Sequence, residues 1–242
     1  MTKKCPIAHA KSYPFDIPKT SYALGKDGWT PLGVGMHETE NRHAVIASGS
    51  NASPLQLVHK YNDHRHLLDH PVYVTYATLH DFDAVYSAHF SSYGSIPATL
   101  AHAPGAKSRV FVTWLTDAQL QRMHETEAVG MNYDYARLHG INLTIENGDT
   151  LGTAHAYLSR RGCLNRDGKP VPLAELPTQN RTWTSMSQGE VLDYARSLIA
   201  PNKDTETFIA EGIKSPALRL KRANTLAQNA LPHGWEKLVF LS

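Results

Sequence analysis

The sequence predicts an α+β fold in which a β-rich middle is followed by a helical C-terminal region. Short runs of β-branched and aromatic residues recur between residues 43 and 159, and the strongest is Val-Phe-Val-Thr-Trp-Leu at 110–115. Helix starts are marked at Ser53, Thr116 and Ser187, each followed three residues later by Gln or Glu in the pattern of a capping box. The last of these opens a tail with apolar residues at helical spacing.

The individual elements follow from the local patterns. Strands are expected at 43–48, 72–79, 98–102, 109–115, 135–145 and 150–159. Helices are expected from residue 54, from 117 to about 127, from 188, at 205–213 and at 216–230. In the first helix Leu55 and Val58 are expected on the buried face, with Leu57 as a further candidate, and residues 81–97 are expected to form a long loop or a broken helix.

Three parts of the chain differ in composition. Residues 1–42 are rich in Pro, Gly, Lys and His without a sustained period, and they are expected to form an irregular N-terminal arm that wraps the domain. Its expected anchors are the aromatic residues Tyr13, Phe15, Tyr22 and Trp29. Residues 43–184 are expected to form the main domain, and residues 185–242 a helical extension packed on that same domain.

Composition excludes several classes of function. The 242 residues carry a formal net charge of +2, too small for the field that nucleic acid binding requires. No stretch approaches the roughly 20 apolar residues of a membrane span, and the N-terminus lacks the apolar run of a secretory signal. Cys5 and Cys163 match no zinc or redox spacing; one disulfide and two reduced thiols both remain open, and reduced thiols are favoured. We therefore expect a soluble, cytoplasmic protein.

The loop Ser48-Gly49-Ser50-Asn51 leaves a buried strand and enters a helix. Loops of small residues at such a point expose several backbone N–H groups in one concavity, and these groups bind anions, including carboxylates. The alternative is a tight turn in which Gly and Asn merely tolerate a positive φ. Both interpretations stay open from the residues of the loop alone.

A metal site is the next alternative, because carboxylate and imidazole side chains cluster at Asp63, His64, His66, Asp69 and His70. His64 and His66 are two positions apart and do not share a helix face. The segment His-Glu-Thr-Glu-Ala at 124–128 also fails the His-Glu-x-x-His zinc pattern, since its fifth residue is Ala128. No metal site is expected. Nucleotide-binding glycine motifs and the Gly-x-Ser-x-Gly nucleophile motif are absent.

Five segments between about residues 44 and 159 resemble, in order, motifs of the γ-glutamylcyclotransferase-like superfamily. The Gly-Ser-Asn loop is similar to the Tyr-Gly-Ser-Asn-Leu loop of that family, with Ser48 in place of the aromatic residue and Ala52 in place of the aliphatic one. The other four are Gly-Ser-Ile-Pro-Ala-Thr-Leu at 94–100, the strand at 110–115, Leu-Gln-Arg-Met-His-Glu-Thr-Glu at 120–127 and Tyr-Asp-Tyr-Ala-Arg at 133–137.

The resemblance implies a small, strongly curved mixed or barrel-like sheet flanked by helices. It also implies a transferase or lyase that needs no metal or cofactor. In such enzymes the α-amine of a γ-glutamyl amine or peptide attacks its own γ-carbonyl, which yields 5-oxoproline and a free amine. The Ser48–Asn51 loop would hold the substrate's α-carboxylate. The identity of the amine and the oligomeric state stay open.

The resemblance assigns the catalytic acid and base to Glu127. Helical spacing directs this residue to the face of Leu120 and Met123, whereas the rival Glu125 is about 200° away around the helix. Tyr133 and Tyr135 share one face of the following strand, and they are candidates to close the pocket or to bind substrate. The competing hypothesis is a non-catalytic binding or scaffold protein of the same fold, since a fold alone does not establish activity.

Overall fold

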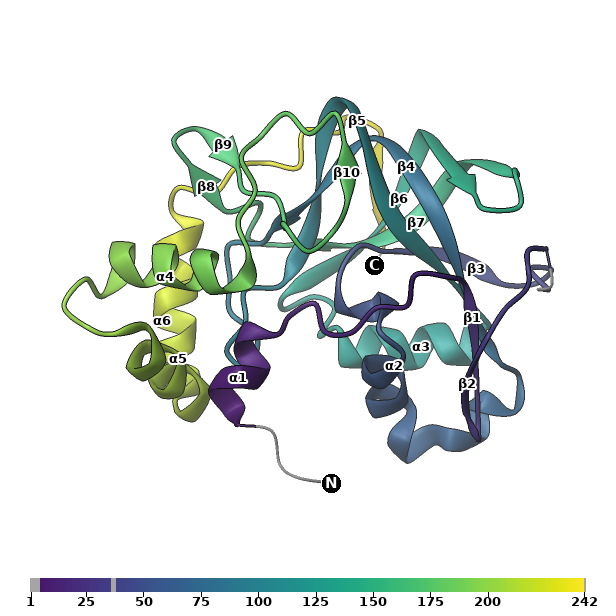
Figure 1. Ribbon diagram of the computed structural model, residues 1–242, viewed down its shortest axis with the longest axis horizontal. Coiled ribbons are helices and arrows are strands. Elements are labelled where there is room, and N and C mark those ends of the chain that lie inside the picture. Colours follow the sequence, from purple (N-terminus) through teal and green to yellow (C-terminus); the bar gives the residue numbers. More distant parts are fainter. Residues whose placement is uncertain (1–4, 36–37, 242) are drawn as a thin grey trace.

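Five strands close into a small mixed barrel in the computed structural model, which describes residues 5–35 and 38–241 (Figure 1). They are β3 (His43–Ala47), β4 (Val72–Tyr86), β5 (Ala98–Leu115), β6 (Tyr133–Ile145) and β7 (Thr150–Ser159). Their order is β5-β3-β7-β6-β4, and β4 pairs again with β5 to close the barrel. Strands β3 and β7 are parallel and the other neighbours antiparallel. The predicted α+β fold with a curved, barrel-like mixed sheet is confirmed.

Two strands are longer than predicted, so the expected loop or broken helix at 81–97 was wrong in its first part. Strand β4 continues to Tyr86, and β5 unites the two separate strands expected around Pro104. The pairing register of β4 and β5 shifts at Asp81, where His80 opposes Lys107 and Phe82 opposes His102. Pro104 therefore lies in a bulge, where a strand tolerates the missing N–H donor.

Helices α2 (Pro54–Tyr61) and α3 (Asp117–Thr126) lie next to each other at one side of the barrel (Figure 1). The capping box at Thr116 is present as predicted. Ser53 is the N-cap of α2, but its side chain makes no capping bond, so the predicted box there was wrong. The buried face of α2 was also predicted wrongly, because Leu55 and Val58 are exposed. Its buried residues are Pro54, Leu57 and Tyr61.

The N-terminal arm is more regular than predicted. Within the described residues it contains α1 (Pro6–Lys11) and the hairpin of β1 (Tyr22–Gly25) and β2 (Gly28–Pro31), and β1 extends the sheet by pairing with β4. Tyr13 and Tyr22 are buried anchors, whereas Trp29 is 42% exposed. The arm thus crosses from the helical end of the molecule to the barrel (Figure 1).

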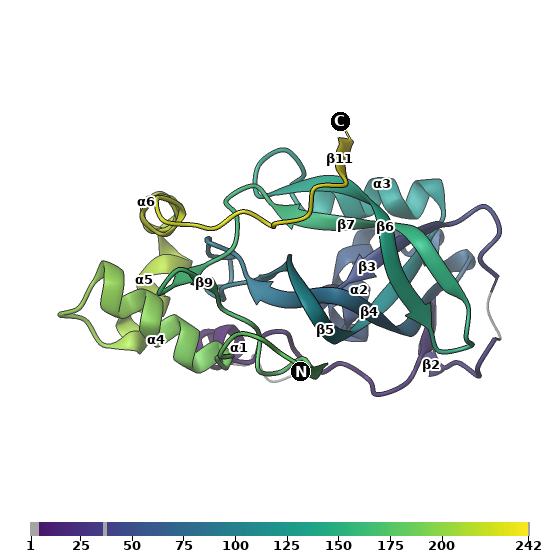
Figure 2. The same ribbon diagram turned by 90° about the horizontal axis from the view of Figure 1, so that it is seen from above.

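The C-terminal helices gather beside α1, at the end of the molecule away from α3 (Figures 1 and 2). They are α4 (Gln188–Ile199), capped by Ser187 as predicted, α5 (Thr205–Lys214) and α6 (Pro216–Ala227). The extension is not helical throughout, because β11 (Leu238–Leu241) returns to pair with β6. The short strands are β8 (Asn165–Arg166), β9 (Lys169–Pro170) and β10 (Thr178–Gln179). Strands β8 and β9 pair with each other, and β10 pairs with β5.

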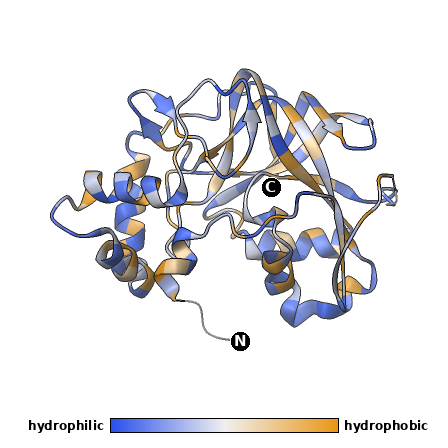
Figure 3. Cartoon of the chain, viewed as in Figure 1, coloured by the Kyte–Doolittle hydropathy of each residue, from blue (hydrophilic) through white to orange (hydrophobic). Residues whose placement is uncertain are grey.

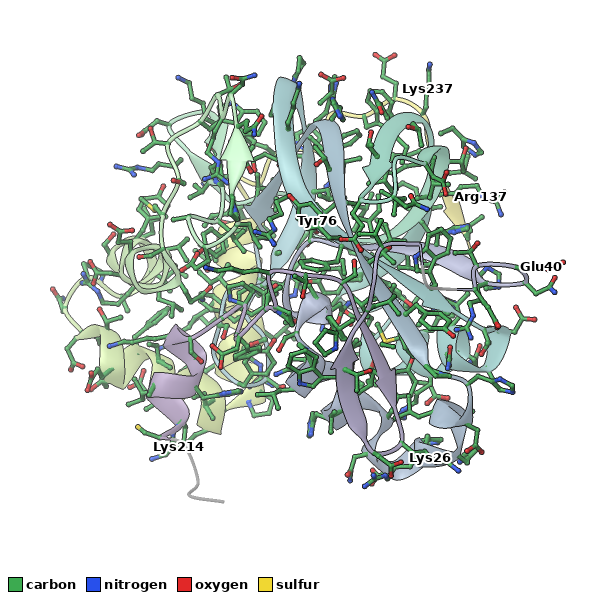
Figure 4. The ribbon with its side chains drawn as sticks, turned by 45° about the vertical axis from the view of Figure 1, so that its right-hand side comes forward. Lys26, Glu40, Tyr76, Arg137, Lys214 and Lys237 are labelled. Atoms are coloured by element: carbon green, nitrogen blue, oxygen red, sulfur yellow. The ribbon has the colours of Figure 1, made fainter. Side chains whose placement is uncertain are left out.

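Apolar side chains form separate clusters in the barrel and between the helices. One cluster draws on all five barrel strands and includes Ile46, Val112 and Leu138. Another joins α1, α4, α5 and α6 to the ends of β4 and β5, and hydrophobic stretches alternate with hydrophilic ones along these helices (Figure 3). The labelled charged residues Lys26, Glu40, Lys214 and Lys237 lie on the outer surface (Figure 4).

Two further expectations concern the chain as a whole. None of the helices in the described ranges has the length and apolar character needed to traverse a bilayer. Both cysteines are free thiols, Cys5 at the surface and Cys163 buried, and burial raises the pKa of Cys163 to about 12. The structure therefore has the two unpaired thiols that the sequence favoured.

Candidate active site

A cavity of about 940 Å³ lies where the barrel meets the helices. Its size falls within the range of ligand pockets, roughly 300–1,000 Å³. Its walls include the arm, the loop after β3, the end of α3, the start of β6 and α6. Of the predicted site residues, Ser48, Gly49, Ser50, Asn51, Glu127 and Tyr133 line this cavity. Tyr135 is not among its lining residues.

Glu127 ends α3, and its backbone N–H donates to Met123 O at 2.9 Å. Leu120 and Met123 are buried, as predicted from the helical spacing, so the side chain of Glu127 is directed inward and is only 13% exposed. Asn51 Nδ2 donates to Glu127 Oε1 at 3.0 Å. The acid at the helix end and the loop at the strand end therefore meet across the same small space.

Lys60 is the residue that sequence reasoning missed. Its ammonium Nζ forms an ion pair with Glu127 Oε1 and also contacts Thr126 Oγ1 at 3.3 Å, and its side chain is only 11% exposed. Glu127 Oε2 has no hydrogen-bond partner within the described ranges. One carboxylate oxygen is thus held by Asn51 and Lys60, and the other is left for a ligand.

The loop approaches the arm closely at Gly49. A Cβ placed on Gly49 would overlap the Tyr13 hydroxyl oxygen and lie 2.9 Å from Ala98 Cβ, so only glycine fits without displacement. The N–H groups of Gly49, Ser50 and Asn51 donate to no backbone carbonyl in the described part of the chain. These are the N–H groups that the sequence analysis proposed as anion donors, and the Ser50 amide lies against the Tyr13 hydroxyl.

The two predicted tyrosines of β6 have different surroundings. Tyr133 donates its hydroxyl to Ala98 O at 3.1 Å and lines the cavity. Tyr135 stacks on His155 with ring centroids 4.9 Å apart, and its hydroxyl is buried without a partner among the described residues. Alternate strand residues lie about 7 Å apart along the chain, which carries Tyr135 past the edge of the cavity.

His89 is a second cavity residue that the sequence did not single out. It is buried, its Nδ1 is paired with Ser87 Oγ at 2.9 Å, and its ring meets Tyr133 edge-on at 5.2 Å. Burial, with a smaller contribution from Arg161, lowers the pKa of His89 to about 3. The imidazole is therefore neutral at physiological pH, so it cannot pair with an anionic ligand by charge.

Two arginines give the cavity a basic wall on the side of α6. Arg161 donates to Asn224 Oδ1 at 2.7 Å, and Arg219 donates to Gly212 O at 2.8 Å. Within the described part of the chain neither guanidinium has a carboxylate at ion-pair distance. Both Arg161 and Arg219 line the cavity, whereas Arg222 is buried.

Two alternatives from the sequence analysis were Glu125 as the acid and a metal site at the histidines. Glu125 is half exposed and forms an ion pair with Arg122 at 2.9 Å, so it does not share the position of Glu127. The rings of His64 and His66 lie 6.1 Å apart. Across residues 5–35 and 38–241, no group of three His, Cys, Asp or Glu side chains is arranged to hold a metal ion.

No family model and no curated protein matches the sequence. Similar solved structures include one described as a gamma-glutamyl cyclotransferase, at 14% identity and a TM-score of 0.38, with 81% of this chain and 91% of that chain covered. An uncharacterized protein from Homo sapiens is similar at 15% identity and a TM-score of 0.36, with 80% of this chain and 90% of that chain covered. A protein from Arabidopsis thaliana is similar at 13% identity and a TM-score of 0.39, with 69% of this chain and 97% of that chain covered. The chain is similar to these proteins, and no residue role is carried over from them.

Proposed function

We propose that this protein is a γ-glutamylcyclotransferase-type enzyme, which converts a γ-glutamyl amine or peptide into 5-oxoproline and the free amine. The observation that carries the proposal is the environment of Glu127. Its Oε1 is held by Asn51 and Lys60, and its Oε2 is left for a ligand at a cavity that also contains the loop amides. The motifs at 48–51 and 120–127 support the same assignment.

The reaction needs one proton carrier and a fixed substrate conformer. Glu127 Oε2 takes a proton from the substrate's α-ammonium and passes it to solvent. As the amine nitrogen then forms a bond to the γ-carbonyl carbon, that nitrogen gives a second proton to Glu127 Oε2. When the bond from that carbon to the leaving amine breaks, Glu127 returns the proton to the leaving nitrogen. The nucleophile and the electrophile belong to one molecule, so holding it in the reactive conformation supplies much of the rate. The N–H groups of Gly49 and Asn51, which donate to no backbone carbonyl in the described ranges, would bind the α-carboxylate.

The basic wall supports a substrate whose amine half carries an anionic group. Lys60 and Arg122 have carboxylate partners in Glu127 and Glu125, whereas Arg161 and Arg219 have none in the part of the chain that the structure describes. Among the described residues, each of these two guanidinium groups makes one hydrogen bond, which leaves further N–H donors for a carboxylate. A γ-glutamyl amino acid or peptide, with its free C-terminal carboxylate, fits this arrangement.

The test is incubation of the purified protein with a panel of γ-glutamyl amino acids, γ-glutamyl dipeptides and γ-glutamyl derivatives of uncharged amines, scored for 5-oxoproline. We expect release from at least one compound that carries a carboxylate on its amine half, and slower release from the uncharged derivatives. Absence of turnover across the panel, combined with binding of the same compounds, would favour the non-catalytic binding protein.

Arg219→Gln should weaken the recognition of that carboxylate. We expect KM for a γ-glutamyl amino acid to rise about 10-fold with kcat nearly unchanged, because the contact stabilises bound substrate and transition state alike. KM for an uncharged γ-glutamyl amine should not change. The matched control is Arg166→Gln, which removes an exposed arginine away from the cavity. Equal effects of Arg219→Gln on both substrates would contradict a carboxylate subsite.

A further inference from the structure

Four tyrosines lie close enough to Glu127 for its negative charge to raise their pKa values, although burial is the larger cause in each. They are Tyr13, Tyr93, Tyr133 and Tyr157. All four line the cavity. Each therefore remains a neutral phenol at working pH, and each could in principle donate one hydrogen bond to a bound ligand.

The hydroxyl groups of two of them already have partners that compete for the proton. Tyr133 donates to Ala98 O, and Tyr157 is paired with His124 Nδ1 at 3.0 Å. Tyr93 is only partly buried, and the hydroxyl groups of Ser50 and Ser91 act on its oxygen as donors that can rotate. A ligand would have to break the bond of Tyr133 or of Tyr157 before it could use that hydroxyl, and Tyr93 is not held by fixed backbone donors.

Tyr13 differs because its oxygen accepts from fixed backbone N–H groups. The backbone N–H of Ala98 donates to Tyr13 Oη at 2.8 Å, and the Ser50 amide acts on the same oxygen. Two donors occupy the lone-pair side of the oxygen, so the O–H bond must point away from both. In the described ranges the structure offers this proton no acceptor. Because the ring is 97% buried and packed beside Gly49, the donor is held in a fixed position.

We propose that Tyr13 is a catalytic residue that donates a hydrogen bond to the substrate's γ-carbonyl oxygen, and this inference rests on the proposed function. As the α-amine nitrogen bonds to the γ-carbon, the carbonyl π electrons move to the oxygen, which becomes an oxyanion. The Tyr13 O–H stabilises that charge without transferring its proton. The carbonyl re-forms when the bond to the leaving amine breaks, and both protons that leave the α-nitrogen pass through Glu127. A fixed donor of this kind typically contributes about 10²–10³ in kcat.

The experiment compares Tyr13→Phe with Tyr22→Phe in the full chain. Tyr22 donates to Ala52 O at 2.9 Å, next to the same loop but outside the cavity, so its variant also removes one buried hydroxyl bond to backbone. We expect Tyr13→Phe to lower kcat by about 10²–10³ with KM within about threefold. Tyr22→Phe should keep kcat within about threefold while its Tm falls.

The outcomes separate this inference from the proposed function. If the native protein turns over no γ-glutamyl compound, both fail. Suppose the native protein is active. If the kcat of Tyr13→Phe then stays within about fivefold of native at a temperature where the variant is folded, only the role of Tyr13 is overturned. The same holds if Tyr13→Phe loses no more kcat than Tyr22→Phe does. For the case where Tyr13→Phe does not fold, 3,5-difluorotyrosine at position 13 keeps the shape and the accepted hydrogen bonds. Because it is more acidic, activity should then be lost at lower alkaline pH than in the native protein, and an unchanged profile would contradict the proposal.

Discussion

Glu127→Gln should reduce the kcat for 5-oxoproline release by about 10³-fold, because an amide cannot take a proton from the substrate's ammonium group or return it to the leaving amine. The glutamine oxygen can still accept from Asn51 and Lys60, so the cavity should keep its shape. KM is therefore expected to change little. The measurement is steady-state kinetics on the best compound of the γ-glutamyl panel.

The stability effect of this substitution must be separated from the chemical one. Glu127→Gln leaves the nearly buried Lys60 without its counter-charge, and removing one partner of a buried ion pair costs about 3–5 kcal/mol. The double variant Glu127→Gln with Lys60→Gln removes the unpaired charge and should recover much of the Tm without recovering kcat. The control is Glu125→Gln on the same helix, which should retain kcat within about threefold. Full activity of Glu127→Gln would refute the assignment of Glu127 as the acid and base. Loss of activity in Glu125→Gln but not in Glu127→Gln would refute it as well.

Gly49→Ala should lower kcat/KM by about 10²-fold and also lower the Tm. The new methyl group would overlap the Tyr13 hydroxyl and press on Ala98 Cβ, and overpacking of this kind costs about 1–3 kcal/mol. The backbone at Gly49 is extended, with φ of −164°, so the effect is steric and not conformational. Displacing the loop or Tyr13 by about 1 Å is enough to cost 10²-fold in rate. Kinetics and thermal melts measure the two effects.

Two further variants identify the cause of the Gly49→Ala defect. Gly152→Ala adds a methyl group at an exposed strand position with open space around it, so Tm and kcat/KM should stay close to native. Gly49→Ala combined with Tyr13→Phe deletes the oxygen that the methyl group meets, and part of the Tm should return while turnover does not. Native-like behaviour of Gly49→Ala would show that the loop and the arm can move apart freely.

The sequence predicted that Glu127 and the Ser48–Asn51 loop would face the same pocket, because local patterns mark both of them. Ser48–Asn51 lies between a recognisable strand and helix, and Glu127 follows Leu120 and Met123 at helical spacing. Lys60 was not predicted because it sits in a polar run of α2, and only the packing of α2 against α3 brings it to Glu127. The face of α2 was misjudged for a related reason. Leu57 and Tyr61 form its buried stripe at a spacing of four. The prediction instead gave weight to Leu55 and Val58, which are apolar but exposed.

Long-range pairing explains the other differences. No local pattern around Pro104 indicates that β5 continues, because the continuation depends on its partner β4 and on the bulge at Asp81. The arm shows no local period either, and its hairpin is stabilised by pairing with β4. Arg161 and Tyr13 reach the cavity only after the C-terminal helices and the arm have packed on the barrel. Such contacts have no signature in a single sequence.

The walls of the cavity are contributed by residues from His9 to Ala223, almost the whole length of the chain. During synthesis the arm, the loop and Glu127 emerge from the ribosome long before α6 does. A nascent chain without α6, or a fragment cut in the loop between α4 and α5, lacks Arg219 and with it half of the basic wall. The complete pocket is therefore a property of the finished chain only.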